Sequence, residues 1–207
     1  MALFFESVAP PMTTTKEALV ALGANLTFGG LSPDRTILAA IAALGREGFL
    51  IDQLSNLYET PCFPAGAGPD YVNAAATIPL RQGQTAAGVL TVLHRVEAEF
   101  GRERLQRWGM RTLDLDLIAI SDSVLPDLVT YTEWQRLAAD SQRAQAPDQL
   151  ILPHPRLQDR AFVLVPLADV APDWCHPVLG QTIRQMLAAL PQSDRDAVVV
   201  LKTRKSD

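Results

Sequence analysis

Asp114 and Asp116 are the residues whose type and spacing most directly suggest chemistry. They lie two positions apart in the run 111–120, whose other residues are mostly leucine and isoleucine. This run predicts a strand that reaches the core, and side chains at positions i and i+2 of a strand share one face, about 6–7 Å apart. Two carboxylates so placed repel each other unless a cation lies between them, and their oxygens suit a hard divalent cation. The alternative is an edge strand whose aspartates face water.

Arginines are concentrated just before this strand. They are Arg95, Arg102, Arg104, Arg107 and Arg111. A cation-binding acidic pair beside anion-binding arginines is a common arrangement for handling a polyphosphate. Residues 101–109 are polar and lack a hydrophobic period, so we expect a loop there, with Trp108 in a mobile lid over a charged site. A run of arginines is more often a solvated surface, but this one leads directly into the two aspartates.

Other candidate ligand-binding residues give weaker signals. Tyr71 and Asn73 share one face of a predicted strand, and an aromatic ring beside an amide suits a flat heterocycle, although an ordinary strand face explains these two residues alone at least as well. His154 lies between two prolines in an extended backbone, where it could contact a ligand or cap a loop. Glu97 flanks the apolar stripe of a predicted helix, and a solvated surface glutamate is the default interpretation.

Hydrophobic periodicity predicts the elements that position these residues. We expect strands at 18–22, 49–58, 70–78 and 111–120, and helices starting at Ser32-Pro33 and covering 85–100. The glycines at 23, 29 and 30 are interpreted as a plain turn, and the long loop 59–69 as functional. The order β-α-β-β-α-β predicts an α+β, ferredoxin-like antiparallel sheet, with the first and third strands central and the helices on one side. The C-terminal additions are expected to include helices near 134–143 and 178–190, a helix or strand at 160–167, and a strand at 197–201.

Composition narrows the class of protein. The chain has 207 residues, 48% of them hydrophobic, and a net charge of −5, which does not favour a nucleic-acid-binding protein. Two cysteines and no evident signal peptide or membrane span favour a reducing, cytoplasmic location. We expect an N-terminal extension at 1–16, a single domain at 17–207 that contains an insertion at 122–149, and a monomer without nucleic-acid or membrane partners.

Several motifs together resemble one family. They are Leu22-Gly23-Ala24-Asn25-Leu26, Leu54-Ser55-Asn56-Leu57-Tyr58-Glu59-Thr60-Pro61, Pro69-Asp70-Tyr71-Val72-Asn73-Ala74, Gly101-Arg102-Glu103-Arg104, Arg107-Trp108-Gly109-Met110-Arg111-Thr112-Leu113-Asp114-Leu115-Asp116, Leu152-Pro153-His154-Pro155-Arg156-Leu157 and Arg160-Ala161-Phe162-Val163-Leu164-Val165-Pro166-Leu167. From about residue 19 to residue 173 the sequence resembles the 6-hydroxymethyl-7,8-dihydropterin pyrophosphokinases of folate biosynthesis. This resemblance implies transfer of the β,γ-pyrophosphoryl group of ATP to a reduced hydroxymethyl-pterin, giving AMP.

The resemblance also implies a role for each matching residue. Asp114 and Asp116 are expected to bind two Mg²⁺ ions with ATP, and Arg102 and Arg111 to act as catalytic lid arginines. The expected ATP contacts are Glu97, Arg104, Arg107, Leu117, His154 and Arg160. The expected pterin contacts are Thr60, Pro61, Phe63, Tyr71, Asn73, Trp108 and Phe162, with the rings of Tyr71 and Phe162 on the two sides of the pterin.

The sequence departs from the family pattern at a few positions. Ala24 stands where the family usually has serine, and Met110 and Cys62 stand where proline is common. The stretch between Asp116 and His154 is longer than usual, and the N-terminal extension has no counterpart. Two other functions remain as alternatives: a ferredoxin-like domain that binds single-stranded RNA on its sheet, and a regulatory domain with a decayed site.

Overall fold

The computed structural model describes residues 16–62, 68–101, 112–138, 141, 145 and 147–202. Its described strands form one antiparallel sheet in the order β5-β1-β4-β3-β6, with β2 paired to β4 beside this path. Their bounds are β1 Glu17–Ala24, β2 Gln53–Leu54, β3 Tyr58–Thr60, β4 Tyr71–Pro79, β5 Asp114–Ile120 and β6 Val199–Val200. β1 and β4, the first and third strands predicted, pair over Glu17–Ala24 and Val72–Pro79, and the acidic strand β5 lies at one edge.

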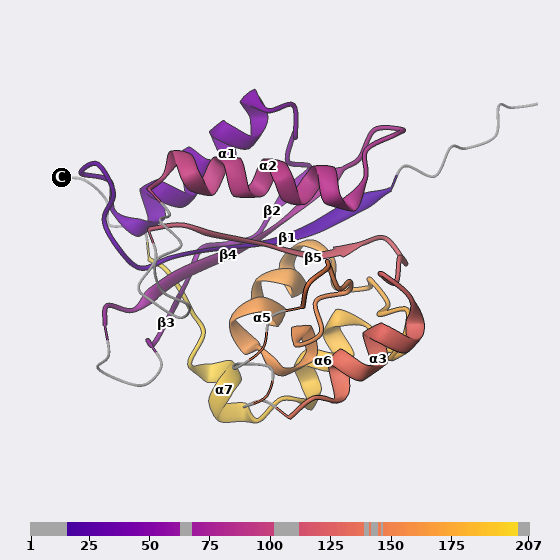
Figure 1. The fold of residues 1–207 in the computed structure, drawn as a ribbon. Helices are drawn as coiled ribbons and strands as arrows, with labels where there is room; N and C mark the ends of the chain where they lie inside the picture. The colour runs from indigo at the N-terminus through magenta and orange to yellow at the C-terminus, as the bar shows by residue number, and fades with distance from the viewer. Residues whose placement is uncertain are drawn as a thin grey trace, which may run out of the picture.

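Helices cover both faces of this sheet, as the edge-on view in Figure 1 shows. The helices α1 (Pro33–Arg46) and α2 (Ala86–Glu99) form one layer, and α5 (Ala161–Val170) and α6 (Ile183–Ala189) pack on the opposite face. The two helices of the predicted β-α-β-β-α-β core therefore lie on one side of the sheet, as expected, and the C-terminal additions supply a second layer on the other side. The shorter helical elements are α3 (Leu128–Arg136), η1 (Leu157–Asp159) and α7 (Gln192–Asp196).

The alternation of side chains along the strands builds two separate cores. Under α1 and α2 the strands contribute apolar residues such as Leu22 and Leu115, which pack with Ile37 and Leu93. On the other face, Leu19, Ala75 and Ile118 pack with Val163 and Ile183 of α5 and α6. An RNA-binding module needs a whole exposed sheet face, whereas here α1 and α2 cover one face and α5 and α6 cover part of the other, which argues against that alternative.

The predicted strand 49–58 is divided into β2 and β3, because Asn56 leaves the ladder. Its backbone N–H and its side-chain amide each donate to Oδ2 of Asp169, at 3.0 Å. The hydroxyl of Ser55 accepts the N–H of Ala75 instead, at 2.9 Å. The prediction of one continuous strand is wrong because a carboxylate from α5, 113 residues further along the chain, binds this backbone.

Local signals explain where the helices begin. Ser32 and Pro33 start α1 as predicted, and the Thr85 hydroxyl caps α2. The helix expected at 134–143 begins earlier, because Asp127 caps α3 by accepting the N–H groups of Val129 and Thr130. The predicted helix 178–190 is shorter and starts after a capping box formed by Thr182 and Gln185. Residues 160–167, predicted as either a helix or a strand, belong mainly to helix α5. Strand β6 confirms the predicted last strand. No described helix has the length and apolar character needed to cross a membrane.

Candidate active site

A strip of small residues lies on the second face of the sheet, where it leads out from the core under α5 and α6. In the strand register, Gly23 lies between Asp114 and Asn73, and Ala21 lies between Asp116 and Ala75. A Cβ atom on Gly23 would stand 3.2 Å from Oδ1 of Asn73. We call Ala21, Gly23 and Ala75 the small-residue strip. It leaves room on the sheet between two carboxylates on β5 and an amide on β4.

A buried hydrogen bond supports the strand between the two carboxylates, and we call it the Glu97 clamp. Asp114 and Asp116 are partly buried, whereas Leu115 between them points into the opposite core. Oε1 of Glu97 on α2 accepts the backbone N–H of Leu115 at 2.7 Å, which satisfies a donor on this edge strand. Glu97 is 1% exposed, so its interpretation as a solvated surface glutamate is wrong. Its predicted contact with ATP stays a prediction.

His154 and Arg160 lie beside the carboxylates. The backbone N–H of His154 donates to the carbonyl of Ile118 at 2.7 Å, which brings this segment alongside β5. Burial and the nearby charge of Arg160 lower the pKa of His154 to about 3, so its ring is neutral at pH 7. Because Nδ1 accepts the N–H of Arg156 at 3.1 Å, the ring proton is on Nε2. Burial also lowers the pKa of Arg160, while the charge of Asp116 acts in the opposite direction.

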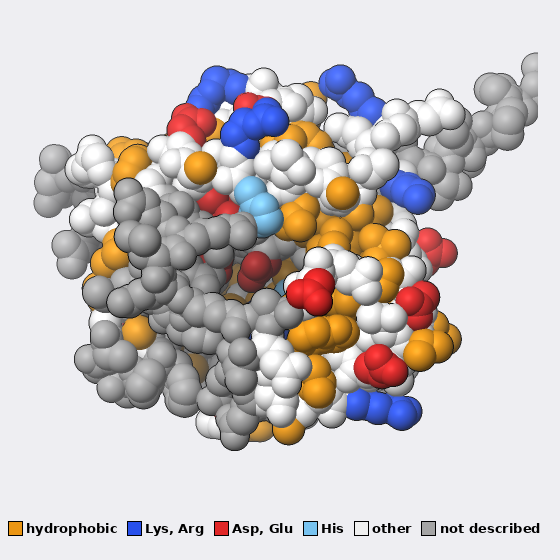
Figure 2. All heavy atoms as spheres, viewed as in Figure 1, with side chains coloured by type: hydrophobic (Ala, Val, Ile, Leu, Met, Phe, Trp, Pro, Cys, Tyr) orange, Lys and Arg blue, Asp and Glu red, His pale blue; other side chains and the backbone are white. Residues whose placement is uncertain are grey.

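These residues line a cavity of about 560 Å³. Asp116, Leu117, His154 and Arg160, all predicted as site residues, lie on its wall. Figure 2 shows a hollow on one face of the molecule, with an acidic side chain inside it and a histidine above it. The volume is within the range of about 300–1,000 Å³ that is typical of small-ligand pockets. The structure therefore brings the predicted metal ligands and part of the predicted ATP group together.

The predicted pterin residues lie across the strip from the carboxylates. Nδ2 of Asn73 donates to the hydroxyl of Thr60 at 2.7 Å, and both side chains are buried. Tyr71, on the same face of β4, is partly buried, and Pro61 is exposed. Phe162 is exposed in the first turn of α5, and the guanidinium carbon of Arg160 lies 5.7 Å from the centre of its ring. This contact links a predicted pterin residue to a predicted ATP residue.

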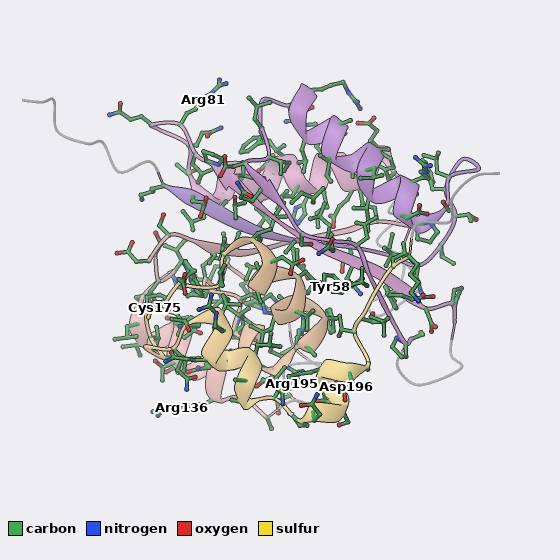
Figure 3. All side chains as sticks on the ribbon, turned by 180° about the vertical axis from the view of Figure 1, so that it is seen from behind. Tyr58, Arg81, Arg136, Cys175, Arg195 and Asp196 are labelled. Carbon is green, nitrogen blue, oxygen red and sulfur yellow. The ribbon has the colours of Figure 1, made fainter. Side chains whose placement is uncertain are left out.

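The loop that follows β3 is fixed at both ends. Cys62 donates its backbone N–H to Asp70 at 3.1 Å, and Nδ2 of Asn25 donates to the carbonyl of Pro69 at 3.2 Å. The turn predicted before α1 is confirmed at Gly29 and Gly30, since Phe28 and Leu31 exchange backbone hydrogen bonds around them, but Gly23 lies within β1 and not in a turn. Tyr58 on β3 donates its hydroxyl to Oδ2 of Asp169 at 2.9 Å, and Figure 3 shows this residue from behind, beside the sheet. Asp169 thus holds the strand that leads to Thr60.

Several predicted site residues lie outside the described part of the chain. They are Phe63, Arg102, Arg104, Arg107, Trp108 and Arg111. Residues on either side of 102–111 are described and are tied together, because the hydroxyl of Thr112 donates to the carbonyl of Phe100 at 2.6 Å. Gly101 has φ of 75°, and a Cβ atom there would be 2.5 Å from the ring of Phe28, so only glycine fits this position.

The donor set fits a hard cation that is shared with a ligand. Asp114 and Asp116 offer carboxylate oxygens from one face of β5, and within the described residues no group of three or more metal-ligating side chains occurs. Mg²⁺ is usually held by one or two carboxylates together with waters and substrate phosphates, and seldom by a cage made only of protein groups. Two carboxylates beside a cavity whose wall carries Arg156 and Arg160 match that pattern.

Sequence reasoning missed part of the cavity wall. His94 and Trp134 line it, as does Arg156, and none of them was predicted as a site residue. Asp169 and the small-residue strip were also missed, since both depend on pairings distant in sequence. Glu97 carried a usable signal: it follows Val89 and Leu93 at four-residue steps, which places it on the buried stripe of α2.

Comparisons with known proteins identify the family of this chain. The family model for 7,8-dihydro-6-hydroxymethylpterin-pyrophosphokinase (HPPK) matches residues 19–172. The 2-amino-4-hydroxy-6-hydroxymethyldihydropteridine pyrophosphokinase of Pseudomonas aeruginosa is 38% identical over 175 residues, covering 83% of this chain and 90% of that protein. The enzyme of the same name from Synechocystis is 37% identical over 172 residues, covering 82% of this chain and 74% of that protein.

Solved structures support the fold. The Plasmodium falciparum HPPK-DHPS wild-type structure aligns with a TM-score of 0.57 at 17% identity, covering 84% of this chain and 44% of that chain. A structure of HPPK-DHPS in complex with substrates aligns with a TM-score of 0.59 at 13% identity, covering 84% of this chain and 43% of that chain. The present chain thus spans less than half of those longer chains, and at such low identity the likeness establishes the α+β architecture.

Proposed function

Since this chain belongs to the 7,8-dihydro-6-hydroxymethylpterin-pyrophosphokinase family, we propose that it transfers the β,γ-pyrophosphoryl group of ATP to 6-hydroxymethyl-7,8-dihydropterin. The products are AMP and the pterin diphosphate. The hydroxymethyl oxygen attacks the β-phosphorus, the bond from that phosphorus to the oxygen bridging the α-phosphate breaks, and the hydroxyl proton is released.

One observation carries this proposal. Asp114 and Asp116 on β5 face the same side of the sheet as Asn73 on β4, with the small-residue strip between them. A polyphosphate at the carboxylates and a flat ring at Asn73 would therefore lie side by side on one surface. Transfer between two bound substrates depends mainly on holding the reacting groups close and in line, which this arrangement supports.

We assign the carboxylates of Asp114 and Asp116 as ligands of two Mg²⁺ ions that enter with ATP. Bound Mg²⁺ would neutralise phosphate charge and polarise the phosphoryl group toward attack. Arg160 remains a cation despite its lowered pKa and binds phosphate oxygens from the cavity wall. His154, neutral with its proton on Nε2, donates a hydrogen bond there without adding charge.

The pterin side of the site is assigned to the pair Asn73 and Thr60. Their mutual hydrogen bond fixes the Asn73 amide, so that its remaining donor and acceptor groups can read the edge of a heterocycle. We assign Tyr71 and Phe162 as the aromatic contacts of the ring, and Arg102, Arg111 and Trp108 as lid residues that close over ATP. We also infer that the strand order corresponds to the ferredoxin-like arrangement, with β2 and β3 together acting as its second strand.

An assay of AMP formation tests this function. We expect AMP from ATP and Mg²⁺ only when 6-hydroxymethyl-7,8-dihydropterin is present. The matched control is 6-methyl-7,8-dihydropterin, which keeps the ring but lacks the attacking hydroxyl. Formation of ADP, or AMP formation that is equal with the control compound, would contradict the proposal.

A further inference from the structure

The cavity beside Asp116 has two chemically distinct sets of lining residues. One set is charged or polar and includes two arginines, Arg156 and Arg160, two carboxylates, Asp116 and Asp148, and His154. The other is aromatic or aliphatic and includes Leu90 on α2, Trp134 on α3, and Leu150 and Ile151. A ligand that joins an anionic chain to a flat apolar ring would satisfy both sets. The proposed function uses the first set but leaves Trp134 without a role.

Helix α3 belongs to segment 122–149, and this segment is held at its base. Leu125 and Leu152 exchange backbone hydrogen bonds of 2.8 and 3.1 Å, which closes the chain between them into a loop on the body of the domain. Asp127 then starts α3 by capping two backbone N–H groups, at 2.9 Å each. The direction of the helix is therefore fixed from its first turn.

A buried contact anchors the middle of α3. Tyr131 is fully buried, and its hydroxyl lies 2.9 Å from Nε2 of His176. Nδ1 of His176 accepts the backbone N–H groups of Val178 and Leu179, so Nε2 carries the proton and donates to Tyr131. The ring of Trp174 lies 5.7 Å from that of His176. These contacts dock α3 on the C-terminal part of the chain.

Trp134 follows Tyr131 by three positions, so both side chains project from the same side of α3. Tyr131 is buried and serves as the anchor, whereas Trp134 is only partly buried and lines the cavity. The position of the helix is thus maintained by Asp127, Tyr131 and His176. A change at Trp134 alters the wall of the cavity and leaves this anchor in place.

We propose that Trp134 strengthens nucleotide binding by packing its indole ring against the base of the bound nucleotide. The inference rests on the proposed function in that it takes the polar set of lining residues as the phosphate-binding part of the cavity. An indole beside leucine and isoleucine side chains offers a purine a flat, apolar surface. Stacking of a base on an aromatic side chain typically tightens binding by about 5- to 150-fold.

The test compares ligands with and without a base. Calorimetry would measure the Kd of α,β-methylene-ATP and of inorganic tripolyphosphate, each with Mg²⁺, for the wild-type chain and Trp134→Ala. We expect the substitution to raise the Kd of the nucleotide about tenfold and to leave that of tripolyphosphate unchanged. Trp134→Phe, which keeps an aromatic ring, should stay within about threefold of wild type.

Control variants make the outcome decisive. Val129→Ala alters an exposed position of the same helix outside the cavity and should change neither Kd. If Trp134→Ala does not fold, Trp134→Leu answers the same question with an apolar side chain. An unchanged nucleotide Kd, or equal weakening of both ligands, would overturn the inference. If the wild-type chain forms AMP but Trp134→Ala does not selectively weaken nucleotide binding, only this inference fails. If the wild-type chain forms no AMP but Trp134→Ala does selectively weaken nucleotide binding, only the proposed reaction fails.

Discussion

The face of the sheet under α1 and α2 and the face under α5 and α6 share every long strand, yet they are lined by different residue types. The first is apolar along its whole length, with Leu22, Ile78 and Leu115 in one continuous core. The second is apolar only where α5 and α6 pack, and it becomes small and polar toward Gly23, Asn73 and Asp114. We call the face under α1 and α2 the stability face and the face under α5 and α6 the site face.

Strand β5 shows how this division works within three residues. Leu115 is 2% exposed and points into the first core, while its neighbours Asp114 and Asp116 point to the site face. Because the side-chain period of a strand is two, a shift of one residue would exchange these roles. The Glu97 clamp on the N–H of Leu115 opposes such a shift. Precise placement of the carboxylates therefore depends on a group that belongs to the stability face.

The largest expected effect comes from removing one charge on the site face. Asp116→Asn keeps the size of the side chain but weakens a metal ligand, so we expect turnover to fall about a thousandfold or more. The free energy of unfolding should change by less than about 1 kcal/mol, since Asp116 is only partly buried. AMP formation and urea denaturation of the same preparation would measure both quantities. Near-normal turnover would contradict the assignment of Asp116 as a metal ligand.

The adjacent residue should behave in the opposite way. Leu115→Ala leaves a cavity in the core under α1 and α2, which typically costs about 3 kcal/mol, and should lower Tm by about 10 °C. Its backbone N–H still donates to Glu97, so the carboxylates on either side keep their support. We expect kcat at about 20 °C to stay within about threefold of wild type. A loss of turnover as large as that in Asp116→Asn would show that the two faces are not separable.

The sequence was sufficient where a pattern is local. The alternation around Asp114 and Asp116, the stripe of α2 and the Ser32-Pro33 start of α1 all depend on residues close together in the chain, and the structure confirms these elements. The two carboxylates were therefore placed correctly on one face before any tertiary contact was known. Six predicted site residues lie outside the described part of the chain, and their roles stay predictions.

The sequence was insufficient where a partner is distant. The break between β2 and β3 depends on a hydrogen bond to Asp169. The burial of Glu97 depends on its hydrogen bond with the backbone of Leu115. The position of Trp134 depends on a hydrogen bond between Tyr131 and His176, 45 residues apart. Neither hydropathy nor motif spacing encodes such pairs. The small-residue strip is likewise visible only once the register of three strands is known.

The contact that anchors α3 gives a pH-dependent effect on stability. Burial lowers the pKa of His176 from its ordinary value of 6.5 to about 4, so the unfolded chain binds this proton more readily than the folded one. The contribution of His176 to stability is therefore complete above about pH 6.5 and declines as the pH falls toward 4, by about 3 kcal/mol in total. Chemical denaturation at about pH 7, 5.5 and 4.5 would measure it.

Two variants isolate this titration. His176→Asn should be less stable than wild type at neutral pH, but its stability should fall less between about pH 6.5 and pH 4.5. Tyr131→Phe removes the hydroxyl beside Nε2 and leaves His176 buried, so it should keep the steeper decline. Parallel pH profiles for wild type and His176→Asn would show that this histidine does not titrate in the assigned range.

The smallest expected effect tests whether the space on the site face matters. Gly23→Ala would place a methyl group 3.2 Å from Oδ1 of Asn73, whose amide also donates to Thr60 and cannot move freely. We expect the KM for the pterin to rise about fivefold, equivalent to about 1 kcal/mol, and the KM for ATP to stay unchanged. Steady-state kinetics with each substrate varied in turn would separate the two values.

A glycine in the helical layer over the stability face provides the matched control. A Cβ atom on Gly45 in α1 would meet no other atom within 4 Å. Gly45→Ala should therefore raise the free energy of unfolding by about 0.5–1 kcal/mol through helix propensity and leave both KM values unchanged. The same change, glycine to alanine, is thus expected to affect substrate binding on one face and only stability on the other. If Gly23→Ala also leaves the pterin KM unchanged, Asn73 has room to adjust, and the small-residue strip does not limit the pterin site.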